Sequence, residues 1–154
     1  MSRKIRFVTD STADLPPEFR EKYDITVVPL KISFGEETYR DYIDITPDEY
    51  YRRLRQADKL PRTSQPSPTD FLEAYKPLVE EGADIISIHI ASALSGTVQS
   101  ARLAKSMLNY THIDVVDSQS ASIFLHAMIL EGVRLAEKGG SKEEILELWQ
   151  SFNS

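Results

Sequence analysis

A chain of 154 residues, 41% of them hydrophobic, is long enough to bury one hydrophobic core, and we expect a single domain over residues 1–154. Its formal net charge of -6 argues against a nucleic-acid partner, because binding to phosphates requires clustered lysine and arginine side chains. The absence of cysteine excludes disulfides and thiolate chemistry, and the spacing of the three histidines indicates no metal site.

The first residues do not resemble a targeting segment. Residues 1–4 are basic, but a short strand-like segment follows them instead of the apolar stretch of a secretory signal. No apolar run in the sequence reaches the length that crosses a membrane. We therefore expect a cytoplasmic protein without an integral membrane segment.

The first third of the chain predicts two extended segments and a short helix. Residues 5–8 favour a strand, which ends in the polar cluster 9–12 and so carries a loop that can face a ligand. Two prolines then open a helix that runs to about residue 23, since proline is tolerated in a first helical turn. Residues 25–34 read as one extended segment, and Gly35 turns the chain back into a second one at 38–42, which predicts a hairpin.

The rest of the chain alternates between helical and strand patterns. Hydroxyl residues at 46, 69 and 141 can cap three of the helices, and the apolar run 123–130 predicts a helix that is buried on more than one side. The expected helices begin at residues 46, 69, 95, 120 and 141, and the expected strands are residues 83–90 and 112–116.

This order of elements predicts an α/β fold, a layered α/β/α domain with a mainly parallel sheet. Open sheets of this kind bind ligands at the carboxyl ends of their strands. Here those ends carry residues 10–12, 92–97 and 117–118, which are rich in hydroxyl groups. We expect the functional site where these three segments converge.

The segment that leads into the helix at residue 95 has the composition of an anion site. Free amides at a helix N-terminus attract a carboxylate or phosphate, and Gly96 allows close approach of the backbone between the hydroxyls of Ser95 and Thr97. The alternative is that Ser95 only caps the helix. Thr63 and Ser64 in the loop 62–68 can donate to the same anion, or this loop merely leads into the next helix with Ser67 or Thr69 as its cap.

Two enzymatic interpretations fit the sequence poorly. Asp10 at a strand end suits a phosphatase nucleophile, but Thr12 stands where that class needs a second carboxylate, so hydrogen bonds from loop amides to Asp10 are favoured. A serine hydrolase fails because Ser95 lacks the preceding glycine of a nucleophile elbow. His89 lies in an apolar strand and is expected to be a hydrogen-bonded core or near-site residue, and His126 is expected to be structural.

Several stretches taken together resemble the DegV family, bacterial fatty-acid-binding proteins that serve as the lipid-carrying subunit of fatty acid kinase. They occur in family order and cover most of the chain, and their combination is highly specific. The matching residues are 8–16 (VTDSTADLP), 27–30 (VVPL), 34–35 (FG) with Tyr39 and Asp41, 63–68 (TSQPSP), 94–97 (LSGT), 99–101 (QSA) and 116–118 (VDS).

The resemblance implies that this chain is the N-terminal domain of a two-domain protein that buries a long-chain fatty acid between its domains. It implies no cofactor, no metal and no catalytic residue, because a separate ATP-binding kinase subunit phosphorylates the bound acid to an acyl-phosphate. Thr63 and Ser95 would contact the carboxylate, and residues 62–68 would form one side of a clamp that faces the helix start at Ser95. The other residues expected at the ligand are Ser64, Gly96, Thr97, Asp10 and Ser11.

Two alternatives stay open at this point. The first is an enzyme that acts on a small phosphorylated or carboxylated substrate, with Asp10 and His89 in acid-base roles. The second is an interaction domain without a ligand, in which the apolar helix surface around residues 124–126 contacts a partner or a second copy of the chain.

Overall fold

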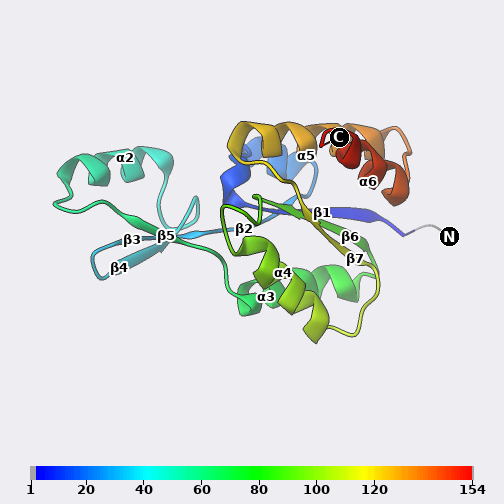
Figure 1. Ribbon diagram of the computed structural model, residues 1–154, viewed down its shortest axis with the longest axis horizontal. Coiled ribbons are helices and arrows are strands. Elements are labelled where there is room, and N and C mark those ends of the chain that lie inside the picture. The colour runs from blue at the N-terminus through cyan, green and yellow to red at the C-terminus, as the bar shows by residue number, and fades with distance from the viewer. Residues whose placement is uncertain (1–2, 154) are drawn as a thin grey trace.

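A four-stranded parallel sheet forms the centre of the protein in the computed structural model, which describes residues 3–153 (Figure 1). Residues 1, 2 and 154 of the expected domain lie outside the described residues. Every pair of neighbouring strands is parallel, so the carboxyl ends share one edge and the predicted α/β class is confirmed. In spatial order the strands are β2 (Thr26–Val28), β1 (Ile5–Asp10), β6 (Asp84–His89) and β7 (Ile113–Asp117).

Helices cover both faces of this sheet and make the α/β/α layering visible (Figure 1). Central strand β6 is buried along five of its six residues, as expected for a parallel strand that packs on both faces. One face carries α1 (Pro17–Lys22), α5 (Ser122–Glu137) and α6 (Lys142–Ser151). The other face carries α3 (Pro68–Glu80) and α4 (Thr97–Met107).

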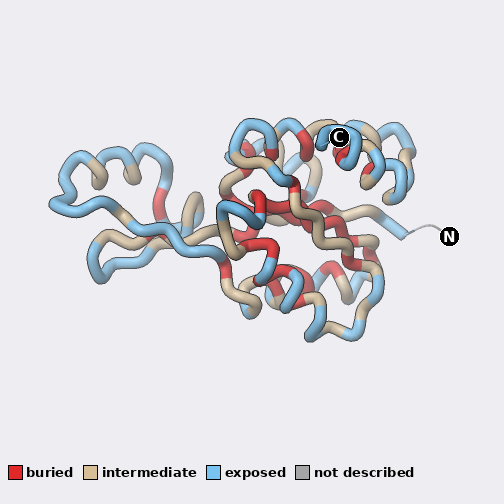
Figure 2. The backbone as a smooth tube through the Cα atoms, in the orientation of Figure 1, coloured by how far each residue is buried: buried red, intermediate tan, exposed pale blue. Residues whose placement is uncertain are grey.

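A second, antiparallel sheet stands beside this core. It forms, together with α2 (Pro47–Gln56), a lobe of residues 31–64 that projects from the main body (Figure 1). None of the residues of α2 is buried, and Figure 2 shows that most of the lobe is exposed. The predicted hairpin is its first half. The strands, in spatial order, are β4 (Glu37–Arg40), β3 (Lys31–Phe34) and β5 (Arg62–Ser64).

Two sequence-based boundaries were wrong for reasons of strand pairing. The extended segment 25–34 divides at Pro29, with β2 paired to β1 and β3 paired to β4 in the other sheet. Proline has no N–H for a strand ladder, which makes it a natural exit point between sheets. The loop expected at 62–68 begins with β5, whose pairing partner β3 is distant in sequence.

The starts of α2, α3 and α6 are each capped by a hydroxyl side chain. The Ser141 side chain accepts from the Glu144 amide at 3.2 Å, as the sequence predicted. For α3 the cap is Ser67 rather than Thr69, because Ser67 and Asp70 hydrogen-bond each other reciprocally at the helix start. A reciprocal pair satisfies two free amides, whereas a single hydroxyl satisfies only one.

Helix α5 departs from the expected burial. Ile123 and Phe124 are 74% and 70% exposed, whereas Leu125, Met128 and Ile129 are buried. The buried residues recur at helical spacing and face the sheet, so one stripe of the helix is buried and its first turn projects into solvent. Within residues 3–153, no helix has both the length and the apolar character that a bilayer crossing requires.

Helices α5 and α6 touch at Gly132. A Cβ atom at this position would lie 2.6 Å from Cζ2 of Trp149, which is buried and donates its indole N–H to the Met128 carbonyl at 2.7 Å. The missing side chain therefore lets the indole approach α5 closely within this core.

We predict that Gly132→Ala lowers the free energy of unfolding by about 1–3 kcal/mol, because the added methyl overpacks the indole site. Urea denaturation would measure this change. Glu137→Ala, at an exposed position of the same helix, is the control and is expected to change stability by less than about 0.5 kcal/mol. Equal effects of the two variants would contradict the packing explanation.

Candidate functional site

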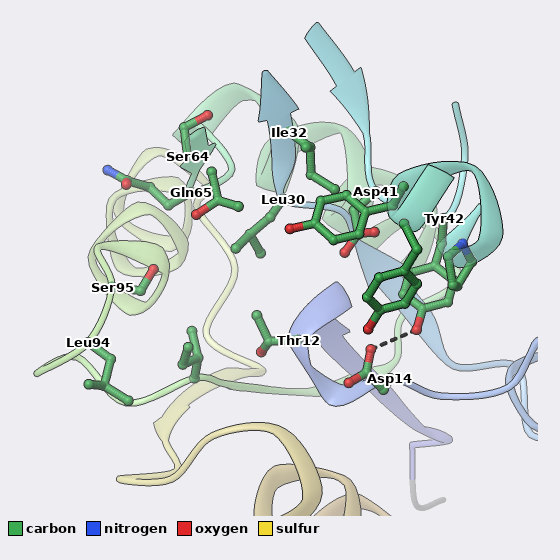
Figure 3. Close-up of a pocket in the computed structure, with 15 residues that line it drawn as sticks. Thr12, Asp14, Leu30, Ile32, Asp41, Tyr42, Ser64, Gln65, Leu94 and Ser95 are labelled. Carbon is green, nitrogen blue, oxygen red and sulfur yellow. Dashed lines mark hydrogen bonds between the residues drawn. The ribbon is translucent and has the colours of Figure 1, made fainter. Parts of the chain in front are cut away.

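A pocket of about 440 Å³ lies between the lobe and the carboxyl edge of the parallel sheet (Figure 3). Strand-end segments form one wall and the lobe forms the other, so the site lies where the fold class predicted it. The lining residues are Thr12, Asp14, Leu30, Ile32, Asp41, Tyr42, Pro47, Tyr50, Tyr51, Thr63, Ser64, Gln65, Ile90, Leu94 and Ser95.

One end of the pocket presents hydrogen-bond donors, and we call Thr63, Ser64, Gln65 and Ser95 the hydroxyl end. Figure 3 shows Ser64 and Gln65 on one side of an open space, with Ser95 beside them in the loop that leads into α4. Among the described residues, the side chains of Thr63, Ser64 and Gln65 have no hydrogen-bond partner. These groups are therefore available to bind a ligand.

The stretch 62–68 faces the start of α4, as the sequence predicted. A Cβ atom at Gly96 would lie 2.8 Å from Nε2 of Gln65, so the glycine allows the two segments to touch. Helix α4 is capped by Gly96 and not by Ser95. Ser95 Oγ instead lies 2.8 Å from Oγ1 of Thr97 and accepts a long hydrogen bond from the Thr97 amide at 3.3 Å.

Of the seven predicted ligand residues, the structure places three on the pocket surface. Thr63, Ser64 and Ser95 line the pocket. Gly96 lies just behind this surface against Gln65, and the side chain of Thr97 is buried under Ser95.

The opposite end of the pocket is acidic and consists of Asp14, Asp41 and Tyr42 (Figure 3). The Tyr42 hydroxyl donates to Oδ1 of Asp14 at 2.6 Å. Burial raises the pKa of Asp41, and burial together with the hydrogen bond to Asp14 raises the pKa of Tyr42. Tyr42 is therefore a protonated donor at neutral pH, and its bond holds the lobe to the loop after β1.

Ser11 hydrogen-bonds the segments that enter and leave β3 and β4 of the lobe. It is buried, its Oγ accepts from the Leu30 amide at 3.0 Å, and it hydrogen-bonds the carboxyl of Asp41. Ser11 thus anchors the point at which the chain leaves the parallel sheet for the lobe, and it does not line the pocket.

Asp10 is also buried and organises the strand ends instead of facing the pocket. One carboxylate oxygen accepts from both the amide and the hydroxyl of Thr12, and the other accepts from the Ile90 amide at 3.1 Å and lies 3.1 Å from Nδ1 of His89. These loop-amide bonds are the ones that the sequence favoured. Burial opposes ionisation, but the hydrogen bonds outweigh it and hold the pKa of Asp10 below its usual value.

His89 has no exposed surface, which agrees with its expected role as a hydrogen-bonded core residue. Neither His89 nor Asp10 lines the pocket, so neither can reach a substrate there to perform the acid-base role of the enzyme alternative. His126 is structural, with Nδ1 3.0 Å from the Ala13 carbonyl oxygen. In the described part of the chain, no group of three or more His, Cys, Asp or Glu side chains is placed to hold a metal ion.

Asp117, the last residue of β7, fixes the loops at the third strand end. Its carboxylate accepts from the hydroxyl of Ser92 at 2.5 Å and from the Gln119 amide at 2.9 Å. The loop that carries Leu94 and Ser95 is thereby fixed to the end of β7. Two carboxylates, one at the end of β1 and one at the end of β7, therefore position the loops around the pocket.

Sequence reasoning missed the apolar and aromatic wall that the lobe and Leu30, at its entry, contribute. Leu30 and Ile32 lie between the two polar ends in Figure 3, and Tyr50 and Tyr51 of α2 also line the pocket. The spacing of two between Leu30 and Ile32 was a usable signal, because alternate residues of an extended segment share one face.

Residues 4–154 match the family model described as "Uncharacterised protein, DegV family". The chain belongs to the DegV family. A DegV domain-containing protein of Clostridium perfringens is 48% identical over 142 residues, which are 92% of this chain and 51% of that protein. The chain spans about half the length of the DegV relatives that it matches.

Solved DegV structures share this fold. A DegV family protein from Thermus thermophilus, described by its fatty acid binding, has a TM-score of 0.87 and 42% identity, over 96% of this chain and 52% of that one. The Fatty Acid Kinase (Fak) B3 protein of Streptococcus pneumoniae, loaded with linoleic acid, has a TM-score of 0.80 and 26% identity, over 96% and 53% of the two chains.

The hydrogen bonds of Asp10 should make the free energy of unfolding depend on pH. Because its pKa is lower in the folded than in the unfolded chain, its contribution is complete above the unfolded-state value of about 4 and is lost as the pH falls toward the folded-state value. Asp10→Asn should lower the free energy of unfolding at pH 7 by about 2–4 kcal/mol, and this difference should shrink below about pH 4.

Denaturation in urea across this pH range would measure the difference. Asp24→Asn is the control, because Asp24 is exposed and asparagine tolerates its left-handed backbone at φ 51°. A loss in Asp10→Asn that stays constant as the pH falls would contradict the role given to the ionised carboxylate.

Proposed function

We propose that the chain binds the carboxylate of a long-chain fatty acid at the hydroxyl end of the pocket. The observation that carries this proposal is the pairing of unpartnered donors at Thr63, Ser64 and Gln65 with an apolar wall at Leu30 and Ile32. A fatty acid has the same two parts, a carboxylate and a hydrocarbon tail. The fatty acid binding of DegV relatives supports the same ligand class.

Charge determines the direction in which the acid lies. The carboxylates of Asp14 and Asp41 line the far end of the pocket and repel a third carboxylate there. The start of α4 lies beside Ser95, where the positive end of the helix dipole attracts an anion. The head group therefore binds at the hydroxyl end, and the tail begins along Leu30 and Ile32.

The two parts of the ligand contribute differently to affinity. Charge-assisted hydrogen bonds contribute about 1.5–3 kcal/mol each, whereas burial of the tail contributes about 0.8 kcal/mol per methylene. The tail therefore dominates affinity and the hydroxyl end determines orientation. Since this chain spans about half the length of its relatives, we propose that a further part of such a protein covers the remainder of the tail.

The chain presents the head group and contributes no catalytic residue. Thr63, Ser64 and Gln65 are all exposed, so a carboxylate bound beside them stays accessible from solvent. We assign the chemistry to a separate ATP-binding kinase subunit that converts the carboxylate to an acyl-phosphate. The likeness to a fatty acid kinase B protein supports this assignment.

Alanine substitutions at the head-group contacts test the proposal. Thr63→Ala and Ser95→Ala should each weaken stearate binding by about ten- to a hundredfold, because each removes one charge-assisted hydrogen bond. Isothermal titration with stearate, after delipidation of the purified protein, would measure the dissociation constants.

Ser33→Ala is the matched control. Ser33 also lies in the lobe and carries a hydroxyl, but it bonds Thr38 Oγ1 at 3.0 Å and does not line the pocket. Affinity for stearate should be unchanged in this variant. If Thr63→Ala and Ser95→Ala bind stearate as tightly as Ser33→Ala, the proposed head-group site is wrong.

A further inference from the structure

A chain of buried hydrogen bonds runs from α3 to the carboxylate of Asp10. The Tyr75 hydroxyl donates to Oγ of Ser87 at 2.7 Å, Ser87 Oγ lies 2.5 Å from Nε2 of His89, and Nδ1 of His89 lies 3.1 Å from Oδ2 of Asp10. All four side chains have no exposed surface. They come from three elements, α3, β6 and β1, that meet in the hydrophobic core between the sheet and helices α3 and α4.

The hydrogen-bond network favours one tautomer of His89. Tyr75 occupies one acceptor position of Ser87 Oγ, and within residues 3–153 the Ser87 hydroxyl has no acceptor other than Nε2 of His89. The Nδ1–H tautomer is the one that gives each of these protons an acceptor, because Ser87 then donates to Nε2 and Nδ1–H donates to Asp10.

The sequence of contacts Ser87, His89, Asp10 has the order of a hydrolytic triad, but it does not perform nucleophilic chemistry. Ser87 Oγ has no solvent access and is already bonded to Tyr75, and the ring of Phe71 packs edge-on against His89 at 5.0 Å between centroids. A substrate has no path to the serine. This series of hydrogen bonds can therefore act only through Asp10, the residue at its other end.

At that end, Asp10 holds two residues of the pocket wall. Its carboxylate binds the amide of Thr12 at 2.9 Å and the amide of Ile90 at 3.1 Å, and both residues line the pocket. Ile90 also begins the loop that continues to Ser95. The Asp10 carboxylate thus bonds two residues of the strand-end wall at once.

We infer that Tyr75, Ser87 and His89 are positioning residues that orient Asp10 and, through it, the pocket residues Thr12 and Ile90. A carboxylate without the Nδ1–H donor on Oδ2 would rotate to recover its lost bond and would pull the Ile90 amide with it. The effect on fatty acid affinity rests on the proposed function, whereas the effect on the pocket wall does not.

The first test is the tautomer of His89 in the ligand-free chain. Long-range ¹H–¹⁵N spectra of the imidazole should show a protonated Nδ1 and an unprotonated Nε2. A proton on Nε2, in either the other tautomer or the charged ring, would overturn the inferred chain of donors. This readout needs neither a variant nor a fatty acid.

The second test compares two tyrosines that support the same core. Tyr75→Phe removes the hydroxyl at the start of the chain of bonds. Tyr110→Phe removes a hydroxyl that donates to the Ala83 carbonyl at 2.6 Å and has no connection to Asp10. Only Tyr75→Phe should shift the amide signals of Ile90 and Thr12. Ser87→Ala, which interrupts the series of hydrogen bonds between Tyr75 and Asp10 at its centre, should shift these amide signals further.

Stearate titration of the same variants completes the design. Tyr75→Phe and Ser87→Ala should weaken binding by about two- to tenfold, and Tyr110→Phe should leave it unchanged. Shifted amide signals with unchanged affinity would overturn the link to the ligand, and amide signals that respond equally to both tyrosine variants would overturn the positioning role. A wild-type chain that binds no stearate would contradict the proposed function alone, because the amide signals test positioning independently.

Discussion

The buried carboxylate of Asp10 is the interaction on which the architecture of the site depends. It lies where β1 ends, and its two oxygens accept hydrogen bonds from segments that follow two different strands. A carboxylate without solvent is stable only if such donors surround it. The hydrogen bonds to Asp10 therefore fix the positions of the loop after β1 and the loop after β6 relative to each other. The pocket forms between these loops and the lobe.

Polar contacts attach the lobe to this frame, and among residues 3–153 no residue of the lobe belongs to either of the two hydrophobic clusters that pack on the parallel sheet. Ser11 holds its entry at Leu30, and Tyr42 bonds Asp14 from within it. Lys31 pairs with Asp70 on α3 at 3.3 Å. The bond between Tyr42 and Asp14 lies in the pocket wall, so this contact both places the lobe and shapes the site.

The parts of the fold that follow local rules were predictable from the sequence. The strand ends rich in hydroxyls converge because parallel strands share one carboxyl edge, and the cap at Ser141 is read directly from its spacing to Glu144. The facing of residues 62–68 and the start of α4 was expected from the family resemblance and not from a local rule, and the close approach of Gly96 to Gln65 agrees with it.

The parts that depend on distant residues were not predictable. The bond between Asp10 and His89 spans 79 positions, and the pairing of β5 with β3 joins segments that only the folded lobe brings together. The exposed first turn of α5, with Phe124, is as apolar as the buried turns that follow it. Which of these apolar side chains are buried depends on how the helix packs on the sheet, and that packing is a tertiary property.

The separation between core and lobe has a consequence for how such a protein can diversify. Because α2 buries none of its residues and the lobe pairs its strands within residues 31–64, substitutions there leave the packing of the parallel sheet untouched. Yet Ile32, Tyr50 and Tyr51 line the pocket. The wall that meets a ligand can therefore change in sequence while the scaffold that positions it stays constant, which allows ligand preference to evolve without loss of the fold.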